Sequence, residues 1–454
     1  MSNNSNLSTR PSSNPSLSAQ TTLHHAALDT WINRHFEEEV RFLQALVQVP
    51  TDTPPGNNAP HAEQAAALLA DFGFAVEKHP VPASEVAAAG LESITNLVVR
   101  VPFGAAIQEE STRKQSTENQ GRTIALNAHG DVVPPGEGWT HAPYGAEIAD
   151  GAMYGRAAAV SKSDFASYTF ALRALQALVA DSMPKNAPQL QGAVELHFTY
   201  DEEFGGELGP GWLLKRGIVK PDLLIAAGFS YAVVTAHNGC LQMEVTVHGQ
   251  MAHAAIPHTG VDALQAAVAI LQALYAQNNL LKQITSSVPG IGHPYLNVGQ
   301  IAGGTNTNVV PGKVSFKLDR RMIPEENPES VEADIGRVIA DAAASQCAVG
   351  ITVEVRRLLL ARAMQPTPES EALAAVVQQQ ASAVFGEPIE AIGTPLYTDA
   401  RLYAEAGIPS VIYGAGPRTV LESHAKRADE RLQLEDLRRA TQVIARSLYE
   451  LLRV

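Results

Sequence analysis

The chain has 454 residues, more than one ordinary hydrophobic core organises, and its 45% hydrophobic and 18% charged residues are typical of a globular protein. Its formal net charge of -14 argues against a nucleic-acid backbone or an anionic membrane as partner. No apolar run approaches the ~20 residues of a membrane-spanning helix.

The N-terminal residues 1–22 are rich in Ser, Asn and Thr and lack an apolar segment. This composition predicts a disordered segment rather than a secretory signal. The two cysteines, Cys240 and Cys347, are too few for a disulfide framework or a cysteine-based metal site. We therefore expect a cytoplasmic protein.

Apolar spacing predicts a first helix over residues 26–48 and then an alternation of strands and helices up to residue 229. The strands are expected at 95–104, 123–133, 192–200 and 221–229, and helices at 164–181 and 209–218. This alternation predicts an α/β sheet with helices on its faces.

From residue 240 the order changes to strand, helix, two strands, helix and strand, a compact βαββαβ unit. The alternation of helices and strands returns after about residue 360. The sequence therefore predicts an α/β domain over 23–238 and 360–454, with a smaller α+β domain inserted over 239–359.

Two polar motifs follow predicted strands of the larger domain. In "HGDVV", His129 and Asp131 lie two residues apart, so both side chains point to one side of a strand, where the carboxylate fixes and activates the imidazole. In "YDEEFGG", adjacent acids such as Glu202 and Glu203 need a cation, a shared proton or full solvation. The alternatives are a surface loop and a solvated acidic turn, but strand ends are the usual sites of open α/β sheets.

Other candidates are weaker when taken singly. His253 and His424 are isolated histidines, while Asn308, Arg320 and Arg321 are candidates for binding a carboxylate. The turn "YGAGPR", with Gly414 and Gly416, is suited to presenting backbone N–H groups to an anion.

Together and in this order, the stretches "HGDVVPPGEGWTHAPYGAEIADGAMYGR", "YDEEFGG", "GQMAHAAIP", "GGTNTNVVPGKVSFKLDRR", "TDARLYAEAGIPSVIYGAG" and "ESHAKRADERLQLEDL" resemble the M20 metallopeptidase and amidohydrolase family. The resemblance covers about residues 30–450. It implies a zinc-peptidase-like α/β catalytic domain with an inserted ferredoxin-like lid and dimerisation domain, and hence a homodimer formed through residues 239–359.

The family generally holds two zinc ions with five ligands and uses a Glu as general base. The resemblance assigns metal ligation to His129, Glu203 and His424, with Asp131 orienting His129. It makes Glu202 the base, His253 the group that polarises the substrate carbonyl, often across the dimer, and Asn308 and Arg321 binders of the substrate carboxylate.

Two ligand positions depart from the family pattern. Val160 stands where the family has the Asp that bridges both metals, and Gly228 stands where it has another acid. Neither side chain can bind zinc, and Asp164, one helical turn after Val160, is an unfavoured substitute. Because zinc normally needs three or four ligands, we expect at most one weakly held zinc or other divalent ion, or none.

The expected function is hydrolysis of an amide or peptide bond in a small carboxylate-bearing substrate, an N-acyl amino acid or a dipeptide. Glu202, His253 and Asp131 would be catalytic. One alternative is a metal-independent isomerase or lyase in which His129 and Glu202 move protons. Another is a non-catalytic protein that keeps the carboxylate pocket.

Overall fold

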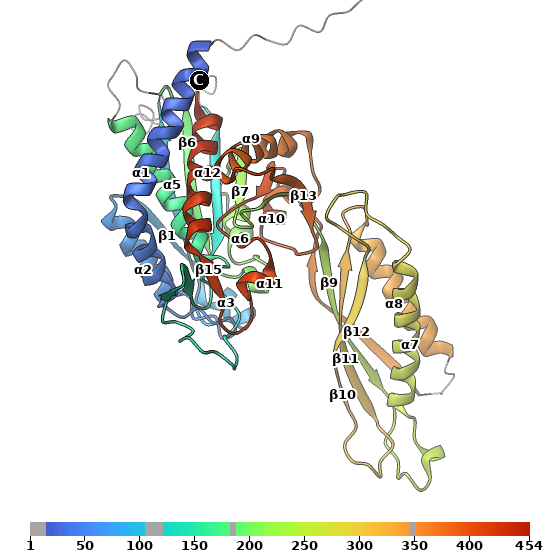
Figure 1. Ribbon diagram of the computed structural model, residues 1–454. Coiled ribbons are helices and arrows are strands. Elements are labelled where there is room, and N and C mark those ends of the chain that lie inside the picture. Colours follow the sequence, from blue (N-terminus) through green and yellow to red (C-terminus); the bar gives the residue numbers. More distant parts are fainter. Residues whose placement is uncertain (1–14, 105–120, 182–187, 346–349) are drawn as a thin grey trace, which may run out of the picture.

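The computed structural model describes residues 15–104, 121–181, 188–345 and 350–454. It has a larger body built on a central sheet and a smaller, elongated body beside it (Figure 1). Two segments of the chain connect the bodies, and His237 and Met364, one on each segment, exchange backbone hydrogen bonds of 3.1 Å.

The central sheet has eight strands in the order β1-β2-β6-β3-β7-β14-β8-β13. Strand β3 is parallel to β6 and β7, and β14 is parallel to β7, so these strands end at the same edge. The strands are β1 (Val76–Pro80), β2 (Thr95–Phe103), β3 (Thr123–His129), β6 (Gly192–Thr199), β7 (Leu223–Ala226), β8 (Ala232–His237), β13 (Glu390–Thr394) and β14 (Ser410–Ile412).

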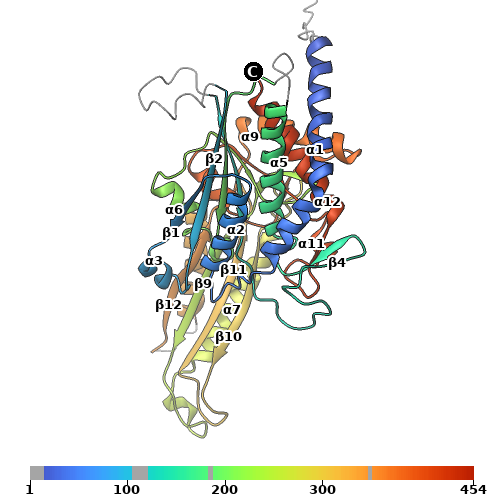
Figure 2. The same cartoon turned by 90° about the vertical axis from the view of Figure 1, so that its left-hand side faces the viewer.

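Helices cover both faces of this sheet because its strands are apolar on both sides. Figure 2, turned by 90°, shows α1 and α5 side by side along one face. That face carries α1 (Pro15–Val47), α2 (Ala59–Asp71), α5 (Lys162–Asp181), α9 (Pro368–Phe385) and α12 (Leu434–Leu452), and the other carries α6 (Pro210–Lys215) and α10 (Ala400–Glu405). The predicted α/β fold class is confirmed.

Short elements complete the larger body around the carboxyl ends of the strands. A three-stranded sheet has the order β15-β5-β4. The bounds are α3 (Ala83–Ala88), β4 (Glu147–Ala149), β5 (Ala152–Tyr154), η1 (Glu202–Phe204), α11 (Val420–Ser423) and β15 (Arg431–Gln433).

The smaller body is the predicted βαββαβ unit, with its own apolar core. Its four-stranded antiparallel sheet has the order β10-β11-β9-β12. The elements are β9 (Gly239–His248), η2 (Pro257–Thr259), α7 (Ala263–Leu281), β10 (Tyr295–Gly303), β11 (Lys313–Met322), α8 (Pro328–Ser345) and β12 (Thr352–Ala361). The domain boundaries at residues 239 and 359 stay a prediction. Cys240 is buried in β9, and Cys347 lies outside the described residues.

The N-terminal prediction needs a correction. Helix α1 begins at Pro15, so residues 15–22 are helical, whereas residues 1–14 lie outside the described part. The reason is packing that the local composition does not reveal: the Tyr449 hydroxyl lies 2.8 Å from His24 Nδ1, and Arg453 donates to Thr21 at 2.7 Å. Among the described helices, none is long and apolar enough to cross a membrane.

A buried acid lies where α1 packs against α12. Glu39 is fully buried, and its Oε1 lies 2.5 Å from the hydroxyl of Thr441, which also donates to the Leu437 carbonyl at 2.9 Å. A hydroxyl has one proton, so a protonated Glu39 that donates to Thr441 satisfies both contacts. Burial raises the pKa of Glu39 to about 8.

We expect the Glu39→Gln variant to gain stability over the wild type as pH rises from about 4.5 to 8. In the wild type, the pKa of Glu39 is about 8 in the folded state, above its usual value of 4.5. Across this window the unfolded chain releases the proton while the folded chain keeps it, so the free energy of unfolding falls by roughly 4 kcal/mol. Urea unfolding at several pH values measures the difference. Glu37→Gln, which removes an exposed carboxylate, is the control, and parallel stability curves for wild type and Glu39→Gln would contradict the prediction.

Candidate active site

A cavity of about 310 Å³ opens where β3, β7 and β14 end. This edge of an open α/β sheet is the usual place for a ligand. One part of the lining is apolar and includes Val160, Ala226, Phe229 and Ile412. The other part carries His129, Glu202, Glu203, Arg321, Tyr397 and Lys426.

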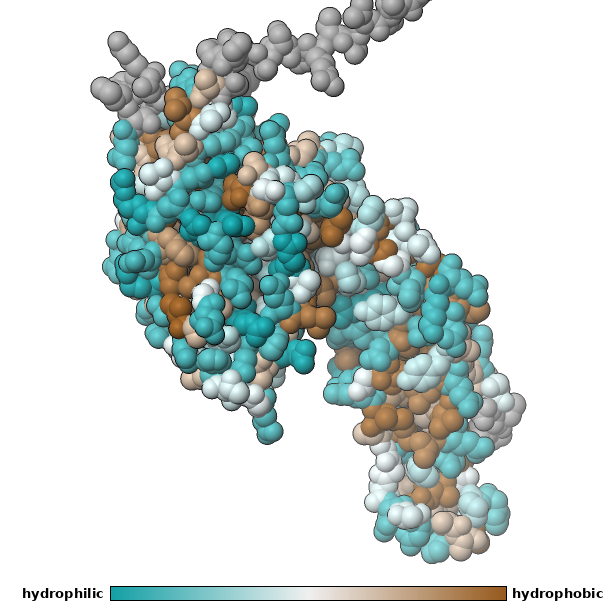
Figure 3. Space-filling view, viewed as in Figure 1, coloured by the Kyte–Doolittle hydropathy of each residue, from teal (hydrophilic) through white to brown (hydrophobic). Residues whose placement is uncertain are grey.

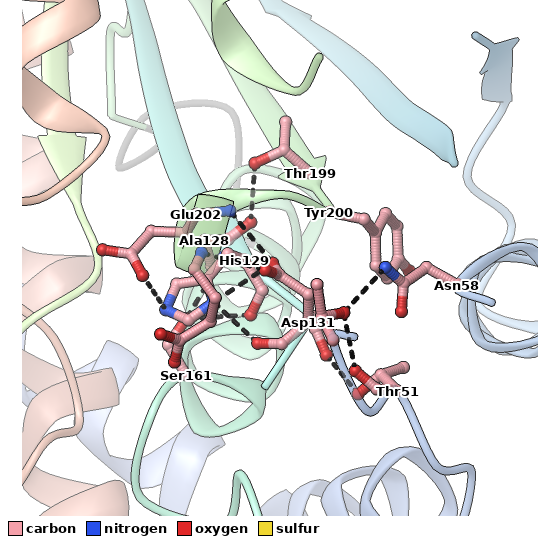
Figure 4. Close-up of polar contacts among 12 residues, drawn as sticks. Thr51, Asn58, Ala128, His129, Asp131, Ser161, Thr199, Tyr200 and Glu202 are labelled. Atoms are coloured by element: carbon pink, nitrogen blue, oxygen red, sulfur yellow. Dashed lines mark hydrogen bonds and ion pairs between the residues drawn. The ribbon is translucent and has the colours of Figure 1, made fainter. Parts of the chain in front are cut away.

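His129 ends strand β3 and is held on both sides of its ring (Figure 4). Its Nδ1 donates to the Asp131 carbonyl at 3.0 Å, which places a proton on that nitrogen, and its Nε2 lies 3.9 Å from Glu202 Oε2. The Ser161 hydroxyl bonds to the backbone N–H and carbonyl of His129 at 3.1 and 3.0 Å. The imidazole is therefore fixed with Nε2 toward Glu202.

Asp131 orients more than the imidazole that the sequence assigned to it. Its fully buried carboxylate lies 3.4 Å from His129 Nδ1. It also accepts the backbone N–H groups of Glu202 at 3.3 Å and Glu203 at 3.0 Å. One carboxylate thus fixes the histidine and the turn that presents both acids.

Burial and charge set the protonation of the His129–Glu202 pair. Burial alone would lower the pKa of His129, but the charges of Glu202 and Asp131 outweigh it and raise the pKa to about 10. Burial raises the pKa of Glu202 to about 7. At neutral pH, His129 is therefore an imidazolium beside a carboxyl that titrates near the working pH of a general base.

Glu203 is paired with a lysine that the sequence analysis missed. The Lys426 ammonium lies 2.6 Å from Glu203 Oε2, and the Glu203 side chain is only 9% exposed. Burial alone would lower the pKa of Lys426, but Glu203 and Glu202 raise it above its usual value. The available signal was the "HAKR" stretch, which places a cation two residues after His424.

The predicted metal ligands do not come together. His424 donates from Nδ1 to the Ala428 carbonyl at 3.1 Å and is not among the residues that line the cavity. Within the described ranges, no three His, Cys, Asp or Glu side chains are placed to hold one metal ion. The three-ligand set of His129, Glu203 and His424 is therefore not assembled.

The two departures from the family pattern are built into the cavity wall. Val160 packs against the core, and a Cβ at Gly228 would lie 2.2 Å from Ile412 Cγ2. Asp164 also lines the cavity, but its Oδ1 already accepts the Ala415 N–H at 2.7 Å. Burial raises the pKa of Asp164 to about 7. The donors present do not fit a two-metal centre.

The close approach of Ile412 to Gly228 leads to a prediction about stability. Gly228→Ala should lower the free energy of unfolding by ~1–3 kcal/mol, because the added methyl overlaps Ile412 Cγ2 and the wall must shift. Urea unfolding measures the loss. Gly292→Ala is the matched control, since a Cβ there meets nothing within 4 Å. Equal stability of the two variants would show that the wall has room for a side chain at position 228.

The candidate site residues of the smaller body lie in different places. Arg321 reaches the cavity from β11, where it pairs with Asp319 at 2.7 Å and lies over the Tyr397 ring. His253 and Asn308 lie together in the smaller body, where Ala254 donates to the Asn308 carbonyl at 2.9 Å, and neither lines the cavity of its own chain. Arg320, also named from the sequence, pairs with Glu326 instead.

The Gly414–Gly416 turn has internal partners for its amides, so anion binding there stays a prediction without free donors to support it. Gly416 donates to the Gly228 carbonyl at 2.8 Å, and Ala415 donates to Asp164. A Cβ at Gly414 would lie 2.1 Å from Asp164 Oδ1, so this glycine makes room for the internal carboxylate. Of the two glycines, only Gly416 lines the cavity.

Asp399 is a second lining residue that the sequence analysis did not single out. It is buried, and burial with the charge of Glu202 raises its pKa well above its usual range. It stands in the "TDARLYAEAG" stretch, whose resemblance to the family was the available signal.

Residues 125–450 match the sequence profile of Peptidase family M20/M25/M40. The chain belongs to this family. Among curated relatives of this M20 protein, a succinyl-diaminopimelate desuccinylase from Methylorubrum populi (strain ATCC BAA-705 / NCIMB 13946 / BJ001) is 26% identical, over 89% of this chain and 96% of the relative.

Solved structures share the fold of this M20 protein. A dipeptidase from Saccharomyces cerevisiae has a TM-score of 0.70 at 13% identity, covering 94% of this chain and 98% of the other. A dinuclear metal-binding M20 peptidase from Bacillus subtilis has a TM-score of 0.61 at 16% identity, covering 92% and 99%. The family thus includes members with two metals. The absence of a donor side chain at Val160 and Gly228 is therefore a departure from such members.

Proposed function

We propose that this M20-family protein hydrolyses an amide bond in a small substrate that carries a carboxylate, an N-acyl amino acid or a dipeptide. The observation that carries the proposal is Glu202, fixed by Asp131 in a cavity that Arg321 also lines. The desuccinylase and dipeptidase names of its relatives support the substrate class.

The chemistry follows from the position of Glu202. Its carboxylate takes a proton from water, the water oxygen attacks the amide carbon, and the proton then passes to the leaving nitrogen as the C–N bond breaks. The products are a carboxylic acid and an amine. The His129 imidazolium, 3.9 Å from Glu202, lowers the pKa of that carboxyl against the effect of burial, so that Glu202 ionises near pH 7, and Arg321 binds the substrate carboxylate.

A second copy of the chain would complete this site. Helix α7 leaves Leu264, Val268 and Tyr275 exposed, and β10 is an edge strand with exposed residues. Apolar side chains gather on the smaller body in Figure 3. We propose a homodimer through residues 239–359, in which the partner subunit's His253 polarises the substrate carbonyl.

The metal content that we propose is at most one weakly held divalent ion, because Val160 and Gly228 offer no donor and His424 does not line the cavity. The cytoplasmic location stays a prediction. The close His129–Glu202 pair also favours a second candidate, a metal-independent isomerase or lyase, since two coupled groups are able to move protons. A non-catalytic binding protein is the remaining alternative.

A panel of N-succinyl and N-acetyl amino acids and dipeptides tests the proposal, with free amine release as the readout. Each active compound is compared with its carboxamide analogue, which should turn over poorly because Arg321 has no carboxylate to bind. Consumption of a substrate without amine release favours the isomerase or lyase. Binding of panel compounds without any turnover favours the binding protein.

A further inference from the structure

We propose that Lys426 is a built-in cation of the candidate site, a positioning residue whose ammonium fixes Glu203 and neutralises the Glu202–Glu203 pair. It takes the electrostatic place that a divalent ion would fill between such acids. This role of Lys426 does not depend on which reaction the site performs.

Glu203 needs a partner of opposite charge. Its side chain is almost buried, it adjoins Glu202 in the chain, and Asp131 holds both residues in one turn. Carboxylates so close repel each other unless a cation or a proton compensates them. The structure supplies a cation, because Lys426 Nζ lies 2.6 Å from Glu203 Oε2.

Lys426 stands on a fixed loop. His424, Lys426 and Asp429 have left-handed φ values of 53°, 61° and 55°, which cost free energy in residues other than glycine. Asp429 ties the loop down by accepting the Thr140 backbone N–H at 2.8 Å. The loop therefore holds the ammonium beside Glu203 at the cavity that Lys426 lines, although the lysine side chain is 55% exposed.

Lys426 also disfavours the binding of a divalent cation at Glu203. An ammonium at Glu203 repels a second cation and occupies the carboxylate that a metal would need. Removing it leaves Glu202 and Glu203 short of positive charge, with His424 in the same loop as the lysine. A divalent ion should then bind more tightly than in the wild type.

The experiment measures binding of Zn²⁺ and Mn²⁺ to the full, chelator-treated chain by calorimetry and by the shift in melting temperature. We expect Lys426→Met to bind Zn²⁺ at least about tenfold more tightly than the wild type. Lys426→Arg, which keeps the charge, should behave as the wild type. Lys215→Met is the control, since it breaks an exposed ion pair with Glu207 outside the cavity.

Equal Zn²⁺ affinity of the wild type and Lys426→Met, whether tight or weak, overturns the inference, and so does weaker binding by the variant. If Lys426→Met does not fold, Lys426→Gln takes its place with the same expectation. The outcome is separate from that of the proposed function: absence of amide turnover removes the hydrolase proposal but leaves this comparison of cation affinities intact.

Discussion

Glu202→Gln should lower amide turnover by a factor of at least about 100 while the variant still binds substrate. The amide cannot take a proton from water, but it has the size of the carboxyl and leaves the backbone N–H bonds to Asp131 in place. Wild-type kcat should rise as pH passes about 7, because only the ionised Glu202 is a base. Steady-state kinetics with isothermal binding of the substrate measures both.

Glu207→Gln is the matched control for this prediction, because Glu207 follows the same turn but is exposed and outside the cavity. It should keep wild-type kcat. Turnover of Glu202→Gln within a few-fold of the wild type would contradict the assignment of Glu202 as the base. His129 would then be the next candidate for the base.

Breaking the ion pair between Arg156 and Glu430 should cost about 3–5 kcal/mol in the free energy of unfolding. The two side chains are 1% and 2% exposed, and their closest atoms are 2.6 Å apart. Glu430 also accepts the Ala159 N–H at 3.3 Å, which ties the Val160 turn to the loop that carries Lys426. Removing the carboxylate leaves a buried guanidinium without its charge partner.

Urea unfolding of Glu430→Ala and Arg156→Met measures this loss. The exposed pair Arg216–Glu85 provides the control, and Glu85→Ala should cost less than about 1 kcal/mol. A double variant that loses less than the sum of the two single variants would show the coupling directly. Single variants within 1 kcal/mol of the wild type would mean that the buried pair does not hold these loops.

The sequence predicted those parts of the fold that depend on local pattern. The alternation of strands and helices and the βαββαβ order follow from apolar periodicity, and the structure has both. The helical start at Pro15 was missed because its cause, packing against α12, joins residues more than 400 positions apart. Local composition there was polar and favoured disorder.

At the candidate site, strand ends placed His129 and Glu202 correctly in one cavity. The sequence did not reveal that Asp164 accepts the Ala415 amide in the turn after Gly414, an amide that an external anion would need. Lys426 could not be found by spacing, since its contact with Glu203 spans 223 residues and depends on a left-handed loop. Contacts between residues so far apart in the chain produce no periodic pattern in the sequence.

The packing around Gly228 distinguishes a site that has been reorganised from one that has only lost a metal ligand. A missing ligand alone would leave space for the lost side chain, whereas Ile412 closes the wall around Gly228. Together with the lysine at Glu203, this indicates a site organised around its own charges.

The most direct test of the account measures amine release and metal content on the same purified sample. Amine release from the substrate panel is assayed while elemental mass spectrometry counts the metal ions in each chain. We predict that turnover proceeds with fewer than two metal ions per chain, because Val160 and Gly228 offer no donor. Turnover that appears only when two zinc ions are bound per chain would contradict the account.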